Sequence, residues 1–346
     1  MATTSSVSLS LRLLSGAAAL AFVTIAAGCD DTSEERGSQP APTFRSLADN
    51  GWQMNSAKFN GWQMNGWQMN GWQMNAVVLD GSSFTGTKIV DGEEVPMAGL
   101  DFIGTEIQLG NDERTVTMRI DDIYPSRPGS DVYFYDISVF DPGTDTWSSL
   151  CRDGEDQPTS AIPLAGAWDM VTGARRNAPD AVTLACRGAA LAKCVEWGYA
   201  PWATASACDG DGENCTQVSL ADHHQACTRM VRADYCGDGT PHTLNGTPID
   251  VIDRLAPQIQ AEGTMARMTW DVEAEWGPDG ARCVGSSLRL QMFDDLEIPY
   301  AIPTCLDALD DHNDCGSMAA DRGAKLFNKF CTAWTSDSAG CGSVKE

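Results

Sequence analysis

Two histidines and an aspartate in the middle of the chain have the side chains that acid and base catalysis uses. His224, Asp234 and His242 lie within one short stretch, with Asp238 and Asp250 close by. Imidazole and carboxylate groups exchange protons near neutral pH, so these residues could serve a hydrolase if the fold brought them within hydrogen-bond reach of one another. An exported hydrolase is therefore one functional hypothesis.

The same stretch offers possible metal ligands. His223 or His224 lies one helical turn from Cys227 and could bind a metal ion together with it. Cys227 and Cys236 are explained more simply as disulfide partners, and Gly237 to Gly239 as a tight turn. We therefore favour a structural role for this stretch, and we expect no metal site and no cofactor.

Two further groups of acidic residues have a simpler interpretation. Asp209 to Glu213 resembles a calcium loop, but it lacks the glycine and the distal glutamate of an EF-hand. Glu273 and Glu275 could be the paired carboxylates of a glycosidase. They alternate with Val272, Ala274 and Trp276 as in a strand with one solvated face, so we expect both glutamates to face solvent.

The chain contains thirteen cysteines, and their number predicts disulfides. If one of them, Cys29, is lipidated, an even set of twelve is left, and none of these forms the CxxC pair typical of zinc sites. Six disulfides are expected in an oxidising compartment, with a connectivity that the sequence leaves open. The twelve are Cys151, Cys186, Cys194, Cys208, Cys215, Cys227, Cys236, Cys283, Cys305, Cys315, Cys331 and Cys341.

The first residues predict export. Residues 1–28 have one base, no acid and an apolar run from Leu13 to Ala27, which is typical of a signal peptide. The sequence from Ile25 to Cys29 resembles the bacterial lipoprotein cleavage site, although Ala26 stands where leucine is commoner. The resemblance implies lipid on Cys29, which would attach the protein to a membrane of the cell envelope, on the periplasmic face of the inner or outer membrane or at the cell surface. Ordinary secretion is the alternative.

The charge of the chain excludes one class of partner. The net charge is −25, and without the signal the chain keeps 22 basic and 48 acidic residues, a net charge of −26. Nucleic acid and anionic headgroups repel such a surface, so we expect no nucleic-acid partner and attachment to the membrane through lipid alone. Residues 29–49 are polar and acidic and predict a flexible tether.

A five-residue repeat follows the tether at 50–89. The unit Asn-Gly-Trp-Gln-Met begins at Asn50 and returns at Asn60, Asn65 and Asn70, while four other units keep only the spacing. The pattern resembles pentapeptide-repeat proteins, which implies a β-helix of two coils, and a flexible linker is the alternative. In either case the indole rings form an apolar surface for a protein or carbohydrate ligand; they belong to Trp52, Trp62, Trp67 and Trp72.

The rest of the chain predicts two domains of an α+β protein. Alternating residues such as Val116, Met118 and Ile120 predict a small antiparallel β domain at 90–173, with Val77 to Val90 as its first edge. A disulfide-rich mixed α/β domain at 174–346 should contain two helices, a hairpin and a last helix. The helices are expected at 185–197 and 219–230, the latter opened by a capping box, the hairpin at 268–292 and the last helix at 319–334.

One motif resembles a known family. The run Ala233-Asp234-Tyr235-Cys236, with Trp197 and Trp202 before it and Trp276 to Gly280 after it, is similar to the ADYC domain of bacterial exported proteins over about 147–305. The resemblance implies an exported fold unit and supplies no catalytic residue. We therefore expect a non-enzymatic binding or structural lipoprotein, with the hydrolase as the alternative.

Overall fold

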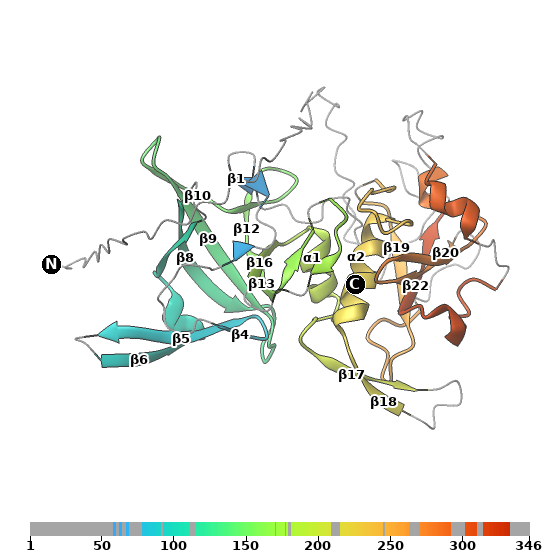
Figure 1. Cartoon of the computed structure of the whole chain (residues 1–346), viewed down its shortest axis with the longest axis horizontal. Coiled ribbons are helices and arrows are strands. Elements are labelled where there is room, and N and C mark those ends of the chain that lie inside the picture. Colours follow the sequence, from blue (N-terminus) through green and yellow to red (C-terminus); the bar gives the residue numbers. More distant parts are fainter. Residues whose placement is uncertain are drawn as a thin grey trace, which may run out of the picture. The chain divides into compact units, whose positions relative to one another are not determined.

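The structure is a computed structural model. It describes residues 58–59, 62–63, 67–68, 78–90, 93–110, 115–169, 171–176, 178, 181–208, 215–244, 246–262, 270–291, 302–309 and 314–332. All of these belong to one compact unit, Ala41–Glu346, and Figure 1 shows their helices and strands. The predicted signal peptide, Cys29 and the tether at 29–49 lie outside the described residues.

An antiparallel sheet forms the first half of this unit. Its strands follow the order β3-β16-β13-β9-β8-β7, and β10 pairs with β9. They are β3 Trp67–Gln68, β7 Glu106–Gly110, β8 Thr115–Pro125, β9 Tyr133–Asp141, β10 Thr146–Ser149, β13 Ala161–Ala165 and β16 Ala181–Cys186. The predicted antiparallel strands are confirmed. The sheet also includes β16, so it extends past the domain boundary that we expected after residue 173.

Both faces of this sheet are buried. In β9, Tyr135, Ile137 and Val139 point into one hydrophobic core, whereas Phe134 points into another on the opposite face. This follows from the two-residue period of a strand. In β8 the buried positions change from Met118 and Ile120 to Ile123, because a β-bulge between Ile120 and Asp122 shifts the register.

A three-stranded sheet covers the first core. Its strands are β4 Val78–Asp80, β5 Ser83–Val90 and β6 Glu93–Ala98, followed by the short helix η1 Gly99–Phe102. Phe84, Met97 and Phe102 pack against Tyr135, and the backbone N–H of Phe84 donates to the Tyr135 hydroxyl over 3.2 Å. Residues 77–90 were expected to be the first edge of the larger sheet, and this was wrong: the part described forms a sheet of its own.

The described part of the repeat segment shows no β-helix. Strand β1, Lys58–Phe59, pairs with β2, Trp62–Gln63, and β3 joins the edge of β16 through the pairs Trp67–Val182 and Gln68–Ala181. The last two units, from Asp80 to Ile89, belong to the β4–β5 hairpin. The molecule is therefore mostly antiparallel sheet with few helices, which agrees with the α+β class only at that coarse level.

Two α-helices lie in the second core. Helix α1 spans Ala190–Glu196, so only the second half of the helix predicted at 185–197 is helical, and its first residues end strand β16. Helix α2 spans Ala221–Arg232 as predicted. The expected capping box does not form: the N-cap is Leu220, without a side-chain cap, and the Ser219 hydroxyl instead accepts from the Ala221 N–H.

A second antiparallel sheet packs against α2. Its order is β19-β22-β20-β21, with β19 Ile249–Asp253, β20 Trp270–Gly277, β21 Gly280–Val284 and β22 Leu326–Cys331. The predicted hairpin at 268–292 is confirmed as β20–β21. The predicted last helix at 319–334 was wrong over its described part, which contains the short helix η4 Ala320–Arg322 and then β22.

The remaining elements are short. Two-stranded ribbons pair β11 Cys151–Arg152 with β12 Pro158–Thr159, β14 Ala167–Trp168 with β15 Arg175–Arg176, and β17 Thr204–Cys208 with β18 Cys215–Ser219. Two more 3-10 helices are η2 Arg289–Gln291 and η3 Thr304–Ala308.

Candidate functional site

The run Ala233 to Cys236 lies in the turn that ends helix α2. Ala233 is the C-cap in the left-handed conformation, with φ 51°, and its N–H donates to the Met230 carbonyl over 3.0 Å. This conformation costs a residue with a Cβ about 1 kcal/mol or more, so the contacts of the next three residues must hold it. Those residues point into the protein, because Asp234 and Tyr235 have almost no exposed surface.

Asp234 holds two segments together. Its Oδ2 accepts from Arg229 Nη1 at 2.6 Å and from the Gly239 N–H at 3.0 Å, and Arg232 Nη1 lies 4.0 Å away. Burial raises the pKa of this carboxyl, and the neighbouring arginines act in the opposite direction. Arg229 also donates through Nε to the Pro278 carbonyl, which lies in the β20–β21 turn. Asp234 thus fixes the end of α2 against that turn.

Tyr235 lies between an aromatic stack and a carboxylate. Its ring stacks on Trp276 with 5.4 Å between centroids and packs against His242 at 5.9 Å. Its hydroxyl donates to Glu273 Oε1 over 2.5 Å. Burial, together with the charge of Glu273, places the pKa of this phenol well above its usual range, so the hydroxyl keeps its proton and donates.

Glu273 lies at the centre of a buried polar network, so the prediction that it faces solvent was wrong. Arg289 Nε lies 2.8 Å from Oε1 and 2.7 Å from Oε2, and Asn328 Nδ2 donates to Oε2 over 2.6 Å. The Asn328 amide oxygen accepts from Trp276 Nε1 at 2.7 Å. The network therefore joins β20, β22 and η2, and the Tyr235 hydroxyl links it to the turn after α2.

Glu275 is buried too, which corrects the second half of that prediction. Its Oε1 accepts from the backbone N–H groups of Gly316 at 2.9 Å and Met318 at 2.6 Å, and from Arg322 Nη1 at 2.8 Å. Because Glu273 and Glu275 are each paired with a different arginine and neither is exposed, they do not form the pair of carboxylates around an open cleft that a glycosidase needs.

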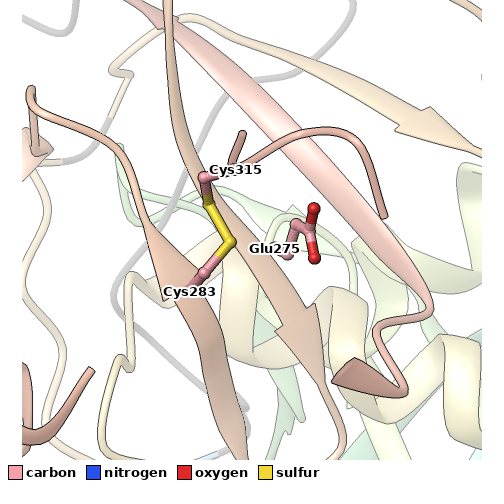
Figure 2. A group of neighbouring side chains, drawn as sticks. All are labelled: Glu275, Cys283 and Cys315. Carbon is pink, nitrogen blue, oxygen red and sulfur yellow. A yellow bond between two sulfur atoms is a disulfide. The ribbon is translucent and has the colours of Figure 1, made fainter. Parts of the chain in front are cut away.

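Glu275 also lies beside two sulfur atoms. A carboxylate oxygen of Glu275 and the Sγ atoms of Cys283 and Cys315 lie within 4.8 Å of one another. Figure 2 shows the three side chains side by side. A metal would need the sulfurs as thiolates. Here they are bonded to each other in a disulfide, so these three residues are not a metal site in this oxidised state.

The three residues of the hydrolase hypothesis contact different parts of the protein. His224 Nε2 donates to the Leu191 carbonyl over 3.0 Å, and its ring meets the edge of Trp168. Burial lowers its pKa to about 4, which leaves the ring neutral. His242 instead packs on Tyr235, and Asp234 binds its arginines. Among the described residues no hydrogen bond joins His224, Asp234 and His242.

The residues around Cys227 that could have been metal ligands have other roles. Cys227 forms a disulfide with Cys194, and His223 stacks on Tyr199 with 6.2 Å between ring centroids. Cys236 bonds to Cys305, so the expectation that Cys227 and Cys236 are disulfide-bonded is met with separate partners. The carboxylate of Asp238 accepts from the Thr240 N–H in its own turn.

Five of the six predicted disulfides are seen among the described residues. Five pairs form, and Cys331 is disulfide-bonded as well; the pairs are Cys151–Cys186, Cys194–Cys227, Cys208–Cys215, Cys236–Cys305 and Cys283–Cys315. Cys341 lies outside the described residues. So do Trp52 and Trp72 of the expected binding surface and the whole acidic 209–213 loop, while Trp62 and Trp67 lie in β2 and β3.

Sequence reasoning missed the basic partners of these acids. Arg229, Arg289 and Arg322 each bind a buried carboxylate, and the sequence places Arg289 and Arg322 far from their partners. One signal was available for Arg229, since it lies one helical turn after Gln225 and Ala226 in the predicted helix and only five residues before Asp234.

One of the comparisons with known proteins identifies a family. The model of the ADYC domain family matches residues 99–290, which is more than half of the chain. The match begins earlier than the resemblance at 147–305 suggested, and it includes every strand of the first sheet except β3, as well as the turn after α2. No curated protein and no solved structure matches the chain.

Proposed function

We propose that this chain, which belongs to the ADYC domain family, is a lipid-anchored binding or structural protein of the cell envelope and not a hydrolase. The observation that carries the proposal is the use of the family's own motif. Asp234 binds Arg229, Tyr235 binds Glu273, and Cys236 is bonded to Cys305. Each functional group of the motif therefore serves an internal contact.

The motif works as a connector between a helix end and a sheet. Asp234 reaches the β20–β21 turn through Arg229, and Tyr235 reaches β20 itself through Glu273. Charges buried in this way are strongly bound to their partners, because removing one partner leaves an unpaired charge in a medium of low dielectric constant. A catalytic acid or base must instead meet a substrate. The geometry thus favours a rigid scaffold.

The disulfides bear on the location of the protein. Five disulfides indicate a protein outside the cytoplasm. None of the helices described in the structure is long and apolar enough to cross a membrane. In our proposal, lipid on Cys29 holds the body at a membrane and the acidic segment 29–49 separates the two.

The tryptophan repeats are the proposed binding surface. Strand β3, which contains Trp67, pairs with the outer edge of β16, so at least one repeat unit is attached to the folded body. Repeated indole rings bind the faces of sugars or apolar side chains of another protein. The proposed ligand is therefore a carbohydrate or protein of the envelope that contacts Trp52, Trp62, Trp67 and Trp72.

Binding by the full chain tests this proposal. We expect the wild type to co-sediment with isolated envelope polysaccharide, or to cross-link to an envelope protein in intact cells, and we expect both signals to vanish when the four repeat tryptophans become alanine. The control is Trp147→Ala, a tryptophan of β10 that packs under Arg119. Unchanged binding after loss of the four indoles would overturn the repeat as the binding surface.

A second measurement addresses the hydrolase. The purified chain is assayed against ester, glycoside and peptide substrates, with His242→Ala beside it. His242 is the candidate residue with the largest exposed fraction, 8 %, and is the residue that a substrate would reach most easily. We expect no turnover by either protein. Turnover by the wild type that His242→Ala abolishes would overturn the non-enzymatic proposal.

A further inference from the structure

The five disulfides differ in the solvent exposure of their two cysteines. The cysteines of two pairs, Cys151–Cys186 and Cys194–Cys227, are buried. Both ends of Cys208–Cys215 and of Cys236–Cys305 have solvent access. In Cys283–Cys315 the ends are unlike: Cys283 is fully buried and Cys315 is partly exposed. Within this pair, Cys315 is the partly exposed residue and therefore the one that an incoming thiolate can approach.

A cation lies beside the buried sulfur. Arg322 Nη1 is 3.6 Å from Cys283 Sγ, which is hydrogen-bond distance for sulfur. The guanidinium is held there by Glu275 at 2.8 Å and by Asp314 at 2.6 Å. A positive charge beside a sulfur stabilises its thiolate, and a disulfide breaks faster when the departing sulfur is a stable thiolate. Cys283 is therefore the better leaving group of the two.

A hydrogen-bond acceptor completes the arrangement. Glu275 has no exposed side-chain surface, and its Oε2 has no hydrogen-bond partner among the described residues. Figure 2 shows this carboxylate beside the Cys283–Cys315 bond. After reduction its free oxygen can accept a hydrogen bond from a neighbouring thiol, which keeps that thiol beside the other sulfur for reoxidation.

We propose that Cys283–Cys315 is a thiol–disulfide exchange site for an exported dithiol protein. A thiolate of the partner attacks Cys315 Sγ and forms a mixed disulfide with it, while the electron pair of the broken bond leaves on Cys283 as a thiolate beside Arg322. The partner's second thiolate then attacks the partner's own sulfur in the mixed disulfide. The partner becomes a disulfide, and its two thiol protons end on Cys283 and Cys315.

The exchange also changes the protein's structure. Cys315 precedes Gly316 and Met318, whose N–H groups bind Glu275, so the disulfide ties this backbone to β21. Opening the bond removes that tie and leaves the segment held by its other contacts, which include the hydrogen bonds to Glu275, the ion pair of Arg322 and the packing of Met318. The site therefore couples the redox state of one bond to the order of the residues around 314–318.

The order of reduction in the wild-type chain is the first test, and it needs no variant. The full chain is treated with limiting dithiothreitol, alkylated at intervals, and mapped by mass spectrometry. We expect Cys283 and Cys315 to be alkylated before the cysteines of the other four pairs. Earlier opening of Cys208–Cys215 or Cys236–Cys305, which are the other pairs with solvent access, would overturn the proposal.

Variants of Arg322 test the leaving group. Arg322→Gln should slow the opening of this one pair by about tenfold, because the departing thiolate loses its cation, and Arg322→Lys should restore most of the rate. Arg176→Gln, which changes an exposed arginine far along the chain in β15, is the control and should have no effect. If Arg322→Gln and Arg322→Lys open the Cys283–Cys315 disulfide at the same rate, the positive charge does not have the proposed role.

Single-cysteine variants test which sulfur is attacked. Cys283→Ser leaves Cys315 as a partly exposed thiol and should form a mixed disulfide with oxidised glutathione, whereas Cys315→Ser leaves only the buried Cys283 and should react far more slowly. The product is measured as the mass added to each peptide. Faster reaction at Cys283 would reverse the assignment and overturn the mechanism.

Discussion

Arg289 Nε lies between the two carboxylate oxygens of Glu273, 2.8 Å from one and 2.7 Å from the other, and neither side chain has any exposed surface. The same carboxylate accepts from the Tyr235 hydroxyl and the Asn328 amide. This pair is thus the point at which the turn after α2, η2 and two strands of the second sheet meet. Its removal should affect all of them together.

Replacing Arg289 alone should destabilise the protein strongly. Arg289→Met leaves Glu273 charged and unpaired in the core, which costs about 3–5 kcal/mol of unfolding free energy. Denaturant unfolding of the oxidised chain measures this. The double variant Glu273→Leu with Arg289→Met should lose less than Arg289→Met alone, because no charge is left behind. If the double variant has a lower free energy of unfolding than either single variant, the ion pair makes a net stabilising contribution.

The free energy of unfolding should decrease as the pH is lowered, because His224 is buried in its neutral form. Burial lowers the pKa of this imidazole to about 4 from 6.5, so the unfolded chain binds a proton at His224 before the folded chain does. The contribution is fully present above about pH 6.5, is lost as the pH falls towards 4, and totals about 3 kcal/mol, since one pKa unit corresponds to about 1.4 kcal/mol.

The variant His224→Gln isolates that effect. Glutamine can still donate to the Leu191 carbonyl but has no proton to gain, so the difference in unfolding free energy between wild type and variant should shrink between pH 7 and pH 4. Direct titration of the imidazole by NMR is the second measurement. An ordinary midpoint near 6.5 would show that His224 is hydrated.

Two glycines with the same φ should respond differently to alanine. Gly237 and Gly323 both have φ +66°, but a Cβ on Gly237 would lie 2.0 Å from the Asp279 carbonyl oxygen, whereas nothing lies within 4 Å at Gly323. Gly323→Ala should cost only the backbone strain of about 1 kcal/mol. Gly237→Ala must also separate α2 from the β20–β21 turn, at about 3 kcal/mol or more. Equal melting temperatures of the two variants would show that the β20–β21 turn can move away from the added Cβ at no measurable cost in stability.

Lipidation should depend on a single cysteine. Labelled palmitate is expected to be incorporated into the expressed chain, and Cys29→Ser should abolish it, because only Cys29 follows an apolar signal and small residues. Membrane fractionation of the same cells shows whether attachment is lost with the label. If the wild-type chain remains unlabelled, the proposal that Cys29 carries a lipid anchor is wrong.

Strands with a regular two-residue period could be predicted from the sequence. Met118 and Ile120 in β8 and the β20–β21 hairpin, with its Gly277 to Gly280 turn, are examples. The same signal was present and missed in β22, where Leu326, Asn328 and Phe330 are buried and Phe327 and Lys329 are less so. The polar Asn328 concealed the alternation, because its role as a partner of Glu273 was not visible.

The buried glutamates could not be predicted from their own strand. Alternation places Glu273 and Glu275 on the face opposite Ala274, but it does not say what covers that face. The cover comes from Arg289 and Arg322, which follow later in the chain, and from bulges that shift β20 between Val272 and Ala274 and again after Glu275. A buried ion pair requires both partners to be placed, and only the fold places them.

The position of β22 has a consequence for export. This strand, Leu326–Cys331, lies between β19 and β20, although both precede it in the chain. A chain that crosses a membrane from its N-terminal end delivers β19 and β20 first, and each then has an unpaired edge. The sheet can close only when β22 arrives, and its long-range pairing is slow to form. Until then the emerging polypeptide exposes strands that other chains can pair with, so a chaperone that shields them would act in this interval.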